Sequence, residues 1–314
     1  MRRVTLGRTG IETSALGFGG ASLGSRVDAE EGARALAAAL DAGVTWIDLA
    51  PVYGGGRAEE IAGRTIRGRR DEVQICTKVG LRLAGGVGGG LRATLMPLAR
   101  RVMGRLGPLS GALRKAAPKA NARLPLTPEL IRGAIEESLR RLGTDRVEVY
   151  ALHAATPEEA GRDDVRRALE DVVAAGKARA VAVASEPETA AAALAAGAPY
   201  GVVQMPAADA ALTDPILARA RAAGVGAITH SILGETLARL AARAAADPAL
   251  RARLVAAAEI EDPEAAAASL LMRRAFARNP EGVVLVSMLS ARSRARNLAA
   301  ADAPPEDRLA GLDA

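Results

Sequence analysis

Eight short apolar runs alternate with amphipathic stretches along this chain of 314 residues, and this alternation limits the possible folds more than any other feature. Several runs are rich in β-branched residues and almost continuously apolar, which is typical of parallel strands covered on both faces. The runs occupy residues 15–20, 44–50, 73–79, 147–153, 178–185, 201–207, 225–231 and 283–289.

The stretches between the runs carry apolar residues at helical spacing. Residues 28–43, 128–143 and 163–176 are clear examples, and each ends on a glycine or has one at its C-terminal boundary. Thr127 and Asp163 are candidate N-caps. A strand followed by a helix, repeated eight times, predicts an α/β fold, the (β/α)8 TIM barrel.

The sequence predicts one barrel over residues 1–314, with no second domain and no internal repeat. Residues 4–13 are expected to form a β-hairpin that closes the barrel floor. The uncharged stretch 189–208 is broken by glycines and prolines, which favours helix, turn and buried strand over a membrane span. The single cysteine, Cys76, excludes an intramolecular disulfide, and the first residues show no secretory signal. We therefore expect a cytoplasmic protein.

A long basic segment separates the third strand from its helix. Residues 81–127 contain nine Lys or Arg and no Asp or Glu, so the net charge of +6 is local to this insertion and the remainder sums to about −3. A loop of this length is functional or disordered. Three hypotheses remain: a mobile solvated loop, a lid that steers acidic substrates, or basic helices over 92–123 on an anionic membrane surface. The lack of aromatic residues for base stacking argues against nucleic acid.

Ionisable side chains end three consecutive apolar runs. Asp48, Lys78 and His153 end the second, third and fourth runs, and Tyr53 follows Asp48 in the turn. Because catalytic groups of these barrels lie at the C-terminal ends of the strands, the four side chains are expected to converge at the barrel mouth. Each residue alone has an ordinary explanation, such as a loop contact or a solvated strand end. Four on adjacent strands favour a catalytic site.

These four groups suit one kind of chemistry. A phenol has a pKa of about 10, and a nearby ammonium favours the phenolate and lowers that pKa. A carboxylate beyond the lysine holds the ammonium, and a neutral imidazole donates to a substrate oxygen. The tyrosine then protonates an oxyanion as charge develops on it. Carbonyl reduction requires such an acid, together with a hydride that only a cofactor can supply.

The motifs around these residues resemble those of the aldo-keto reductases. The matching stretches are LGRTG, LGFGG, IDLAPVYGGG, EEIAG, TKVG, ESLRRLGTDRVEVYALH and ARNLA, which extend over nearly the whole chain. The resemblance implies that Tyr53 is the general acid, that Lys78 and Asp48 tune it, and that His153 orients a small carbonyl substrate. It also implies NADPH, or NADH, bound across the barrel mouth without a Rossmann domain. No metal is expected.

The resemblance also implies a set of cofactor-binding residues. They are Ser185, Gln204, Ser231, Leu233, Gly234, Ser290, Arg294 and Asn297. Arg292 and Arg296 are further candidates for a 2′-phosphate, with a solvated helix start as the alternative for each arginine. The chain departs from the family pattern at Glu186, where Asn or Asp is usual, at Ala207 and Ala208, where an aromatic platform is expected, and at Ile232, where Pro is usual.

Two residues near the predicted mouth are interpreted as structural. His230 precedes Ser231; it is a candidate for a cofactor contact, but a polar group at a strand end is the favoured interpretation. Cys76 lies two residues before Lys78, hence on the same face of its strand, and is interpreted as core packing. The departures from the family pattern also motivate a second hypothesis for the whole chain, a weakly active or inactive relative that acts as a cofactor sensor or interaction subunit.

Overall fold

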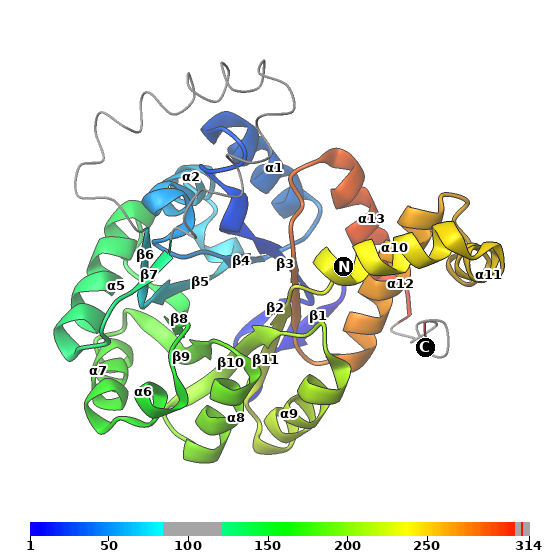
Figure 1. Ribbon diagram of the computed structural model, residues 1–314. Helices are drawn as coiled ribbons and strands as arrows, with labels where there is room; N and C mark the ends of the chain where they lie inside the picture. Colours follow the sequence, from blue (N-terminus) through cyan, green and yellow to red (C-terminus); the bar gives the residue numbers. More distant parts are fainter. Residues whose placement is uncertain (84–120, 305–308, 310–314) are drawn as a thin grey trace, which may run out of the picture.

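Eight parallel strands form a closed barrel, as predicted (Figure 1). A computed structural model describes residues 1–83, 121–304 and 309. Around the barrel the strand order is β10, β11, β12, β3, β4, β5, β8 and β9. Their bounds are β3 (Leu16–Gly19), β4 (Trp46–Asp48), β5 (Gln74–Val79), β8 (Val147–His153), β9 (Ala178–Ala184), β10 (Tyr200–Pro206), β11 (Gly226–His230) and β12 (Val283–Val286).

Helices surround the barrel and cover its outer face (Figure 1). They are α1 (Ala29–Asp41), α2 (Arg57–Thr65), α5 (Pro128–Leu142), α6 (Pro157–Gly161), α7 (Asp163–Ala174), α8 (Pro187–Ala196), α9 (Ala210–Ala223), α10 (Gly234–Ala246), α11 (Pro248–Ala258), α12 (Pro263–Arg278) and α13 (Ala291–Asp302). Short 3-10 turns are η1 (Gly20–Ser22), η2 (Tyr53–Gly56) and η3 (Arg70–Glu72).

The two predicted N-caps have different outcomes. The Thr127 side chain accepts a hydrogen bond from the Leu130 backbone N–H and caps α5, as expected. Asp163 is instead the first residue of α7, because Arg162, which ends the preceding short helix, serves as the N-cap. The Asp163 carboxylate still lies in the first turn, where it interacts favourably with the helix dipole.

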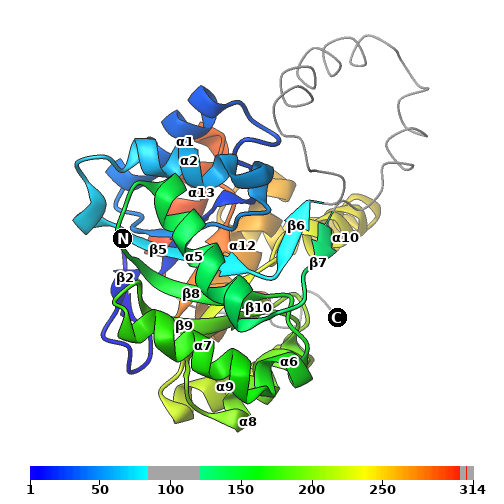
Figure 2. The same cartoon turned by 90° about the vertical axis from the view of Figure 1, so that its left-hand side faces the viewer.

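An N-terminal hairpin closes one end of the barrel. Strands β1 (Arg3–Thr5) and β2 (Glu12–Ser14) pair antiparallel, and Leu6 and Ile11 between them are fully buried. The Arg8 backbone N–H donates to the Gly224 carbonyl at 2.8 Å, which ties the hairpin loop to the turn between α9 and β11. The side view places this hairpin at the end opposite to β6 (Leu81–Leu83) and β7 (Asn121–Arg123) (Figure 2).

Strands β6 and β7 lie in the described part of the basic insertion, residues 81–83 and 121–127. They pair antiparallel, and Arg123 forms an ion pair with Glu159. Residues 84–120 lie outside the described residues. The hypotheses of a lid, a mobile loop and membrane-surface contact over 92–123 therefore stay predictions.

A smaller apolar cluster beside the barrel was not identified from the sequence. Helices α10, α11 and α12 bury Leu240, Leu254 and Leu270 against one another, away from the main core (Figure 1). The uncharged stretch 189–208 contains most of α8 and β10, as expected. Within the described ranges, no helix combines the length and apolar character needed to cross a membrane.

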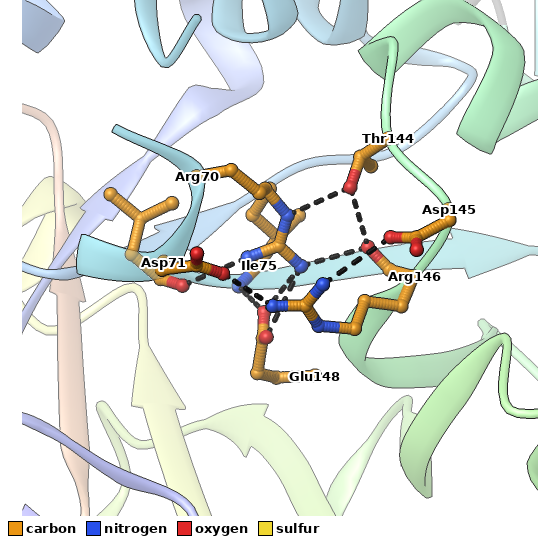
Figure 3. Close-up of polar contacts among 8 residues, drawn as sticks. Arg70, Asp71, Ile75, Thr144, Asp145, Arg146 and Glu148 are labelled. Carbon is orange, nitrogen blue, oxygen red and sulfur yellow. Dashed lines mark hydrogen bonds and ion pairs between the residues drawn. The ribbon is translucent and has the colours of Figure 1, made fainter. Parts of the chain in front are cut away.

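A buried ion pair ties the first part of β5 to β8 (Figure 3). Arg70 reaches both carboxylate oxygens of Glu148 at 3.1 Å, and it also donates to Thr144 Oγ1 at 2.9 Å and to the Val73 carbonyl at 3.1 Å. Glu148 Oε2 accepts from the Ile75 backbone N–H at 2.7 Å. Because Glu148 is only 5% exposed, Arg70 supplies the opposite charge that compensates for the burial of this carboxylate.

We expect Arg70→Met to lower the free energy of unfolding by about 3 kcal/mol, because it leaves the Glu148 carboxylate buried and unpaired. Urea denaturation measures the change. Arg132→Met is the matched control: its partner Asp171 is 57% exposed, and its loss is expected to cost less than about 1 kcal/mol. Equal effects of the two substitutions would contradict this account of the pair.

Candidate active site

The structure brings the four predicted residues together at the C-terminal ends of β4, β5 and β8. The Lys78 ammonium donates to Asp48 Oδ1 at 2.6 Å and to the Leu49 carbonyl at 2.9 Å. It also lies 5.2 Å from the centre of the Tyr53 ring. The rings of Tyr53 and His153 meet edge to face, with their centres 5.9 Å apart. The expected convergence of the four groups is therefore seen in the geometry.

Strand register explains why these side chains share one face. Asp48 is level with Cys76 across the β4–β5 pair, and Cys76 Sγ lies 4.0 Å from Gln204 Oε1 on β10. Both side chains therefore face the barrel interior. Lys78 follows Cys76 by two residues and shares its face, because side chains alternate along a strand. Cys76 is fully buried, which agrees with core packing, and burial raises the pKa of its thiol.

Tyr53 has a raised pKa, and the expected effect of Lys78 is only one contribution to it. Burial raises the phenol pKa most, the Lys78 ammonium lowers it, and the Asp48 carboxylate raises it. The expectation that the ammonium favours the phenolate is correct in direction, but desolvation outweighs it. The phenol is therefore protonated at neutral pH and able to donate its proton.

Lys78 remains charged although it is only 1% exposed. Burial on its own lowers the pKa of the ammonium, and the Asp48 carboxylate more than reverses this, so the pKa lies above its ordinary value. The pair thus supplies a fixed positive charge beside the phenol at any pH near neutrality.

Both histidines of the chain are neutral. Burial lowers the pKa of His153 to about 3, with further lowering from Lys78 and His230. Burial also lowers the pKa of His230 to about 4, which the Asp48 carboxylate partly opposes. A neutral His153 can donate one N–H to a substrate oxygen without adding a second positive charge.

His230 faces the same space as the four residues. Gln204 points into the barrel and is level with Ile228 on β11, so His230, two residues further, points the same way at the mouth. Its Nδ1 lies 2.9 Å from Ser231 Oγ. The sequence favoured a strand-end polar group, and the structure adds that this group lines the mouth.

The predicted cofactor residues occupy two regions, and the first is formed by β9, β10 and the turn after β11. Ser185 follows β9 and Gln204 lies on β10; both are buried, and Ser185 Oγ has no hydrogen-bond partner among the described residues. Ser231 has a positive φ of 59° and Gly234 begins α10, with Leu233 as its N-cap. A buried hydroxyl without a partner is costly, so Ser185 Oγ is available to bond a ligand or a water.

The second region is the start of α13. Ser290 caps this helix and accepts from the Ser293 N–H, and Arg294 lies in its first turn. Asn297 is fully buried and its side-chain amide donates to the Ser287 carbonyl at 3.2 Å, so this amide is already engaged in the fold. Arg292 pairs with Asp262 on the surface.

The departures from the family pattern are visible as local structure. Glu186 is exposed at the N-cap of α8 and makes no side-chain capping bond. Ala207 is buried, and its carbonyl accepts from the Arg278 guanidinium at 2.7 Å. Ala207 and Ala208 therefore leave the site without the aromatic ring that the family pattern places here.

One buried charge beside the site was missed from the sequence. Glu59 of α2 is fully buried and contacts Thr77, the neighbour of Lys78, and Arg141 of α5. The only signal was its place in EEIAG, at a helix position where an exposed glutamate is equally common. The partner Arg141 lies too far along the sequence for a spacing argument.

Comparison with known proteins gives the class. The model of the aldo/keto reductase family matches residues 15–304, and the chain belongs to this family. Aldo-keto reductase YhdN of Bacillus subtilis is 29% identical over 191 residues, which cover 59% of this chain and 47% of that protein. D-threo-aldose 1-dehydrogenase of a Pseudomonas species is 32% identical over 185 residues, covering 56% and 51%. The matched stretches thus span about half the length of these curated relatives.

Solved structures show the same fold over nearly the full chain. Aldo-keto reductase AKR11C1 of Bacillus halodurans, in its holo form, superimposes with a TM-score of 0.73 at 20% identity, covering 99% of this chain and 96% of that one. An aldo-keto reductase of Klebsiella pneumoniae in complex with NADPH gives 0.69 at 24% identity, covering 100% and 95%. At this identity the likeness concerns the fold.

We expect the two half-buried histidines, His153 and His230, to make stability fall at acid pH. Their pKa values in the folded state lie below the ordinary 6.5, so the unfolded chain binds more protons. The stabilisation is fully present above about pH 6.5 and is lost as pH falls, at up to about 1.4 kcal/mol per pH unit for each histidine. Urea denaturation between about pH 6.5 and 4.5 is expected to show a shallower fall for His230→Gln than for the parent. Parallel curves would contradict the assignment.

Proposed function

We propose that this protein reduces an aldehyde or ketone to an alcohol with NADPH, and that Tyr53 donates the proton. The observation that carries this proposal is the packing of a protonated phenol against a buried ammonium–carboxylate pair and a neutral imidazole. Proton donors arranged around one point suit a reaction in which negative charge develops on a carbonyl oxygen. The activity belongs to the class that the family defines, and the residue roles are our proposal.

The cofactor proposal rests on side chains at the mouth. Ser185 Oγ is buried and lacks a partner among the described residues, and buried Gln204 lies on the adjoining strand, so both fit a nicotinamide carboxamide. Ser231, Leu233 and Gly234 would lie along the pyrophosphate. When bound, NADPH supplies the hydride that no side chain can provide. The Klebsiella pneumoniae aldo-keto reductase of the same fold was solved in complex with NADPH.

The adenosine end would lie at the start of α13. Ser290 and Arg294 are the residues available there. The Arg294 guanidinium would pair with the 2′-phosphate, the group that distinguishes NADPH from NADH. Asn297 would act through the fold, because its amide holds the Ser287 carbonyl.

The proton transfer follows from the residues themselves. The substrate oxygen would lie between the Tyr53 hydroxyl and the His153 imidazole, whose rings meet edge to face. As the oxygen gains negative charge, His153 donates a hydrogen bond and Tyr53 transfers its proton. The Lys78 ammonium then stabilises the phenolate, and Asp48 keeps that ammonium in place. Each charge is therefore set before the reaction begins.

A second candidate function is a cofactor sensor or interaction subunit with little turnover. The observation in its favour is that two positions at the mouth depart from the family pattern for cofactor binding. Ala207 is a small buried residue where an aromatic ring is expected, and Glu186 is exposed to solvent where Asn or Asp is usual. A ring platform would contribute on the order of 1 kcal/mol. Titration of NADPH by fluorescence, followed by turnover on methylglyoxal and 4-nitrobenzaldehyde, separates the two. Tight binding without oxidation of NADPH on a broad carbonyl panel would favour the sensor.

Tyr53→Phe is expected to abolish carbonyl reduction and to leave NADPH affinity within about threefold, because only the acid is removed. Steady-state rates and fluorescence titration provide the two readouts. Tyr200→Phe is the control, since this phenol donates to the Ala160 carbonyl away from the mouth and its loss is expected to spare turnover. Substantial turnover by Tyr53→Phe would show that another group is the acid.

Lys78→Met is expected to lower kcat by at least about a hundredfold, because the phenolate left after proton transfer loses its positive neighbour. It also leaves Asp48 buried without its ammonium, so thermal melting must accompany the rate measurement. A folded variant with a kcat close to that of the parent would contradict the role of Lys78.

A further inference from the structure

A third buried ion pair lies directly behind the site, on the outer face of β5. Glu59 is fully buried between α2, α5 and the barrel. Its Oε1 accepts from Thr77 Oγ1 at 2.6 Å, and its Oε2 accepts from Arg141 Nε at 2.6 Å. Each carboxylate oxygen thus holds a different structural element.

The partners of Glu59 adjoin the two residues of the proton transfer. Thr77 immediately precedes Lys78, so its side chain points to the helices while that of Lys78 points into the barrel. On the other side, α2 follows directly from η2, the turn that carries Tyr53. Glu59 therefore links the element that holds the phenol to the strand that holds the ammonium.

Arg141 completes this link by contact with the same turn. The turn passes through Gly54, Gly55 and Gly56 with φ values of 59°, 67° and 92°. A Cβ on Gly56 would lie only 3.0 Å from Arg141 Cδ, so the arginine side chain packs against the glycine backbone. The left-handed turn needs glycine, and the Arg141 side chain lies against it.

We propose that Glu59, with Thr77 and Arg141, is a positioning group that sets the separation between Tyr53 and Lys78. This inference rests on the proposed function. Burying a carboxylate with a guanidinium usually brings no more stability than apolar packing would. What distinguishes the Glu59 pair is its place, between the turn that carries Tyr53 and the strand that carries Lys78. A group at this place can hold the reacting side chains in register within a fraction of an ångström.

The other end of β5 offers a matched control. Glu148 and Arg70 form a buried pair of the same type, in which the carboxylate also bonds to β5, through the Ile75 N–H (Figure 3). This pair lies toward the barrel floor and contacts none of the four site residues. Loss of either pair is expected to lower stability, and only loss of the Glu59 pair is expected to change the chemistry.

The experiment compares Thr77→Val, Thr77→Ser, Glu59→Gln and Glu148→Gln in the full chain, with NADPH and methylglyoxal. Thr77→Val keeps the Glu59–Arg141 ion pair and removes one hydrogen bond. We expect kcat to fall by about ten- to a hundredfold with KM within about threefold. Thr77→Ser is expected to recover kcat to within about threefold of the parent. Glu59→Gln should follow Thr77→Val if it folds.

The pH profile of kcat/KM distinguishes a positioning role from a structural one, because a loss of stability alone leaves this profile unchanged. The groups that face the Tyr53 phenol are Lys78 and Cys76 on β5, Asp48 on β4 and His153 on β8, and His230 on β11 lines the same mouth. If Lys78 moves away, its lowering effect on the phenol pKa is lost and the pKa rises. Because reduction needs the protonated phenol, the basic limb is expected to move to higher pH in Thr77→Val. Glu148→Gln should lower the melting temperature and leave this limb in place.

The outcomes separate the inference from the proposed function. No reduction by the parent protein would overturn the function itself. An active parent in which Thr77→Val lowers the melting temperature, as Glu148→Gln does, while kcat and the basic limb stay unchanged would overturn the positioning role. Failure of Thr77→Ser to recover a lost kcat would overturn it as well.

Discussion

The buried contact between Lys78 and Asp48 is the interaction on which the site depends. A lysine that is 1% exposed would lose its charge in an apolar interior, and the carboxylate 2.6 Å away prevents this. With that charge fixed, the phenol and both imidazoles acquire their protonation states from burial and from the ammonium. One ion pair between adjacent strands thereby determines which groups at the mouth can donate a proton and which remain neutral.

Barrel geometry explains why this pair can form at all. Asp48 and Lys78 come from neighbouring parallel strands whose registers place both side chains on the inner face, and His153 joins them from the next strand. The sequence was sufficient to predict this much, because strand ends and alternation follow directly from the apolar runs. The eight strands, the floor hairpin and the convergence of the four residues all follow from local patterns.

Other features depend on contacts that no local pattern contains. The pairing of Glu59 with Arg141 joins residues on separate helices, and the direction of the His230 side chain follows from its register with β10. The raised pKa of Tyr53 could not be predicted from the sequence for a related reason. The sequence indicates that an ammonium is near, but the extent of burial that outweighs it is a property of the packed molecule. Asp163 became a helix residue because a short helix ends directly before it.

The aromatic content of the chain has a consequence for selectivity. The chain has one tryptophan, two phenylalanines and three tyrosines, and all except Tyr53 are at most 4% exposed within the core. No phenyl or indole wall is therefore available anywhere in the sequence to sandwich a bound molecule. Discrimination among bound molecules must come from hydrogen bonds, from charge and from the shape of an aliphatic surface, with Tyr53 and the two imidazoles as the only rings within reach.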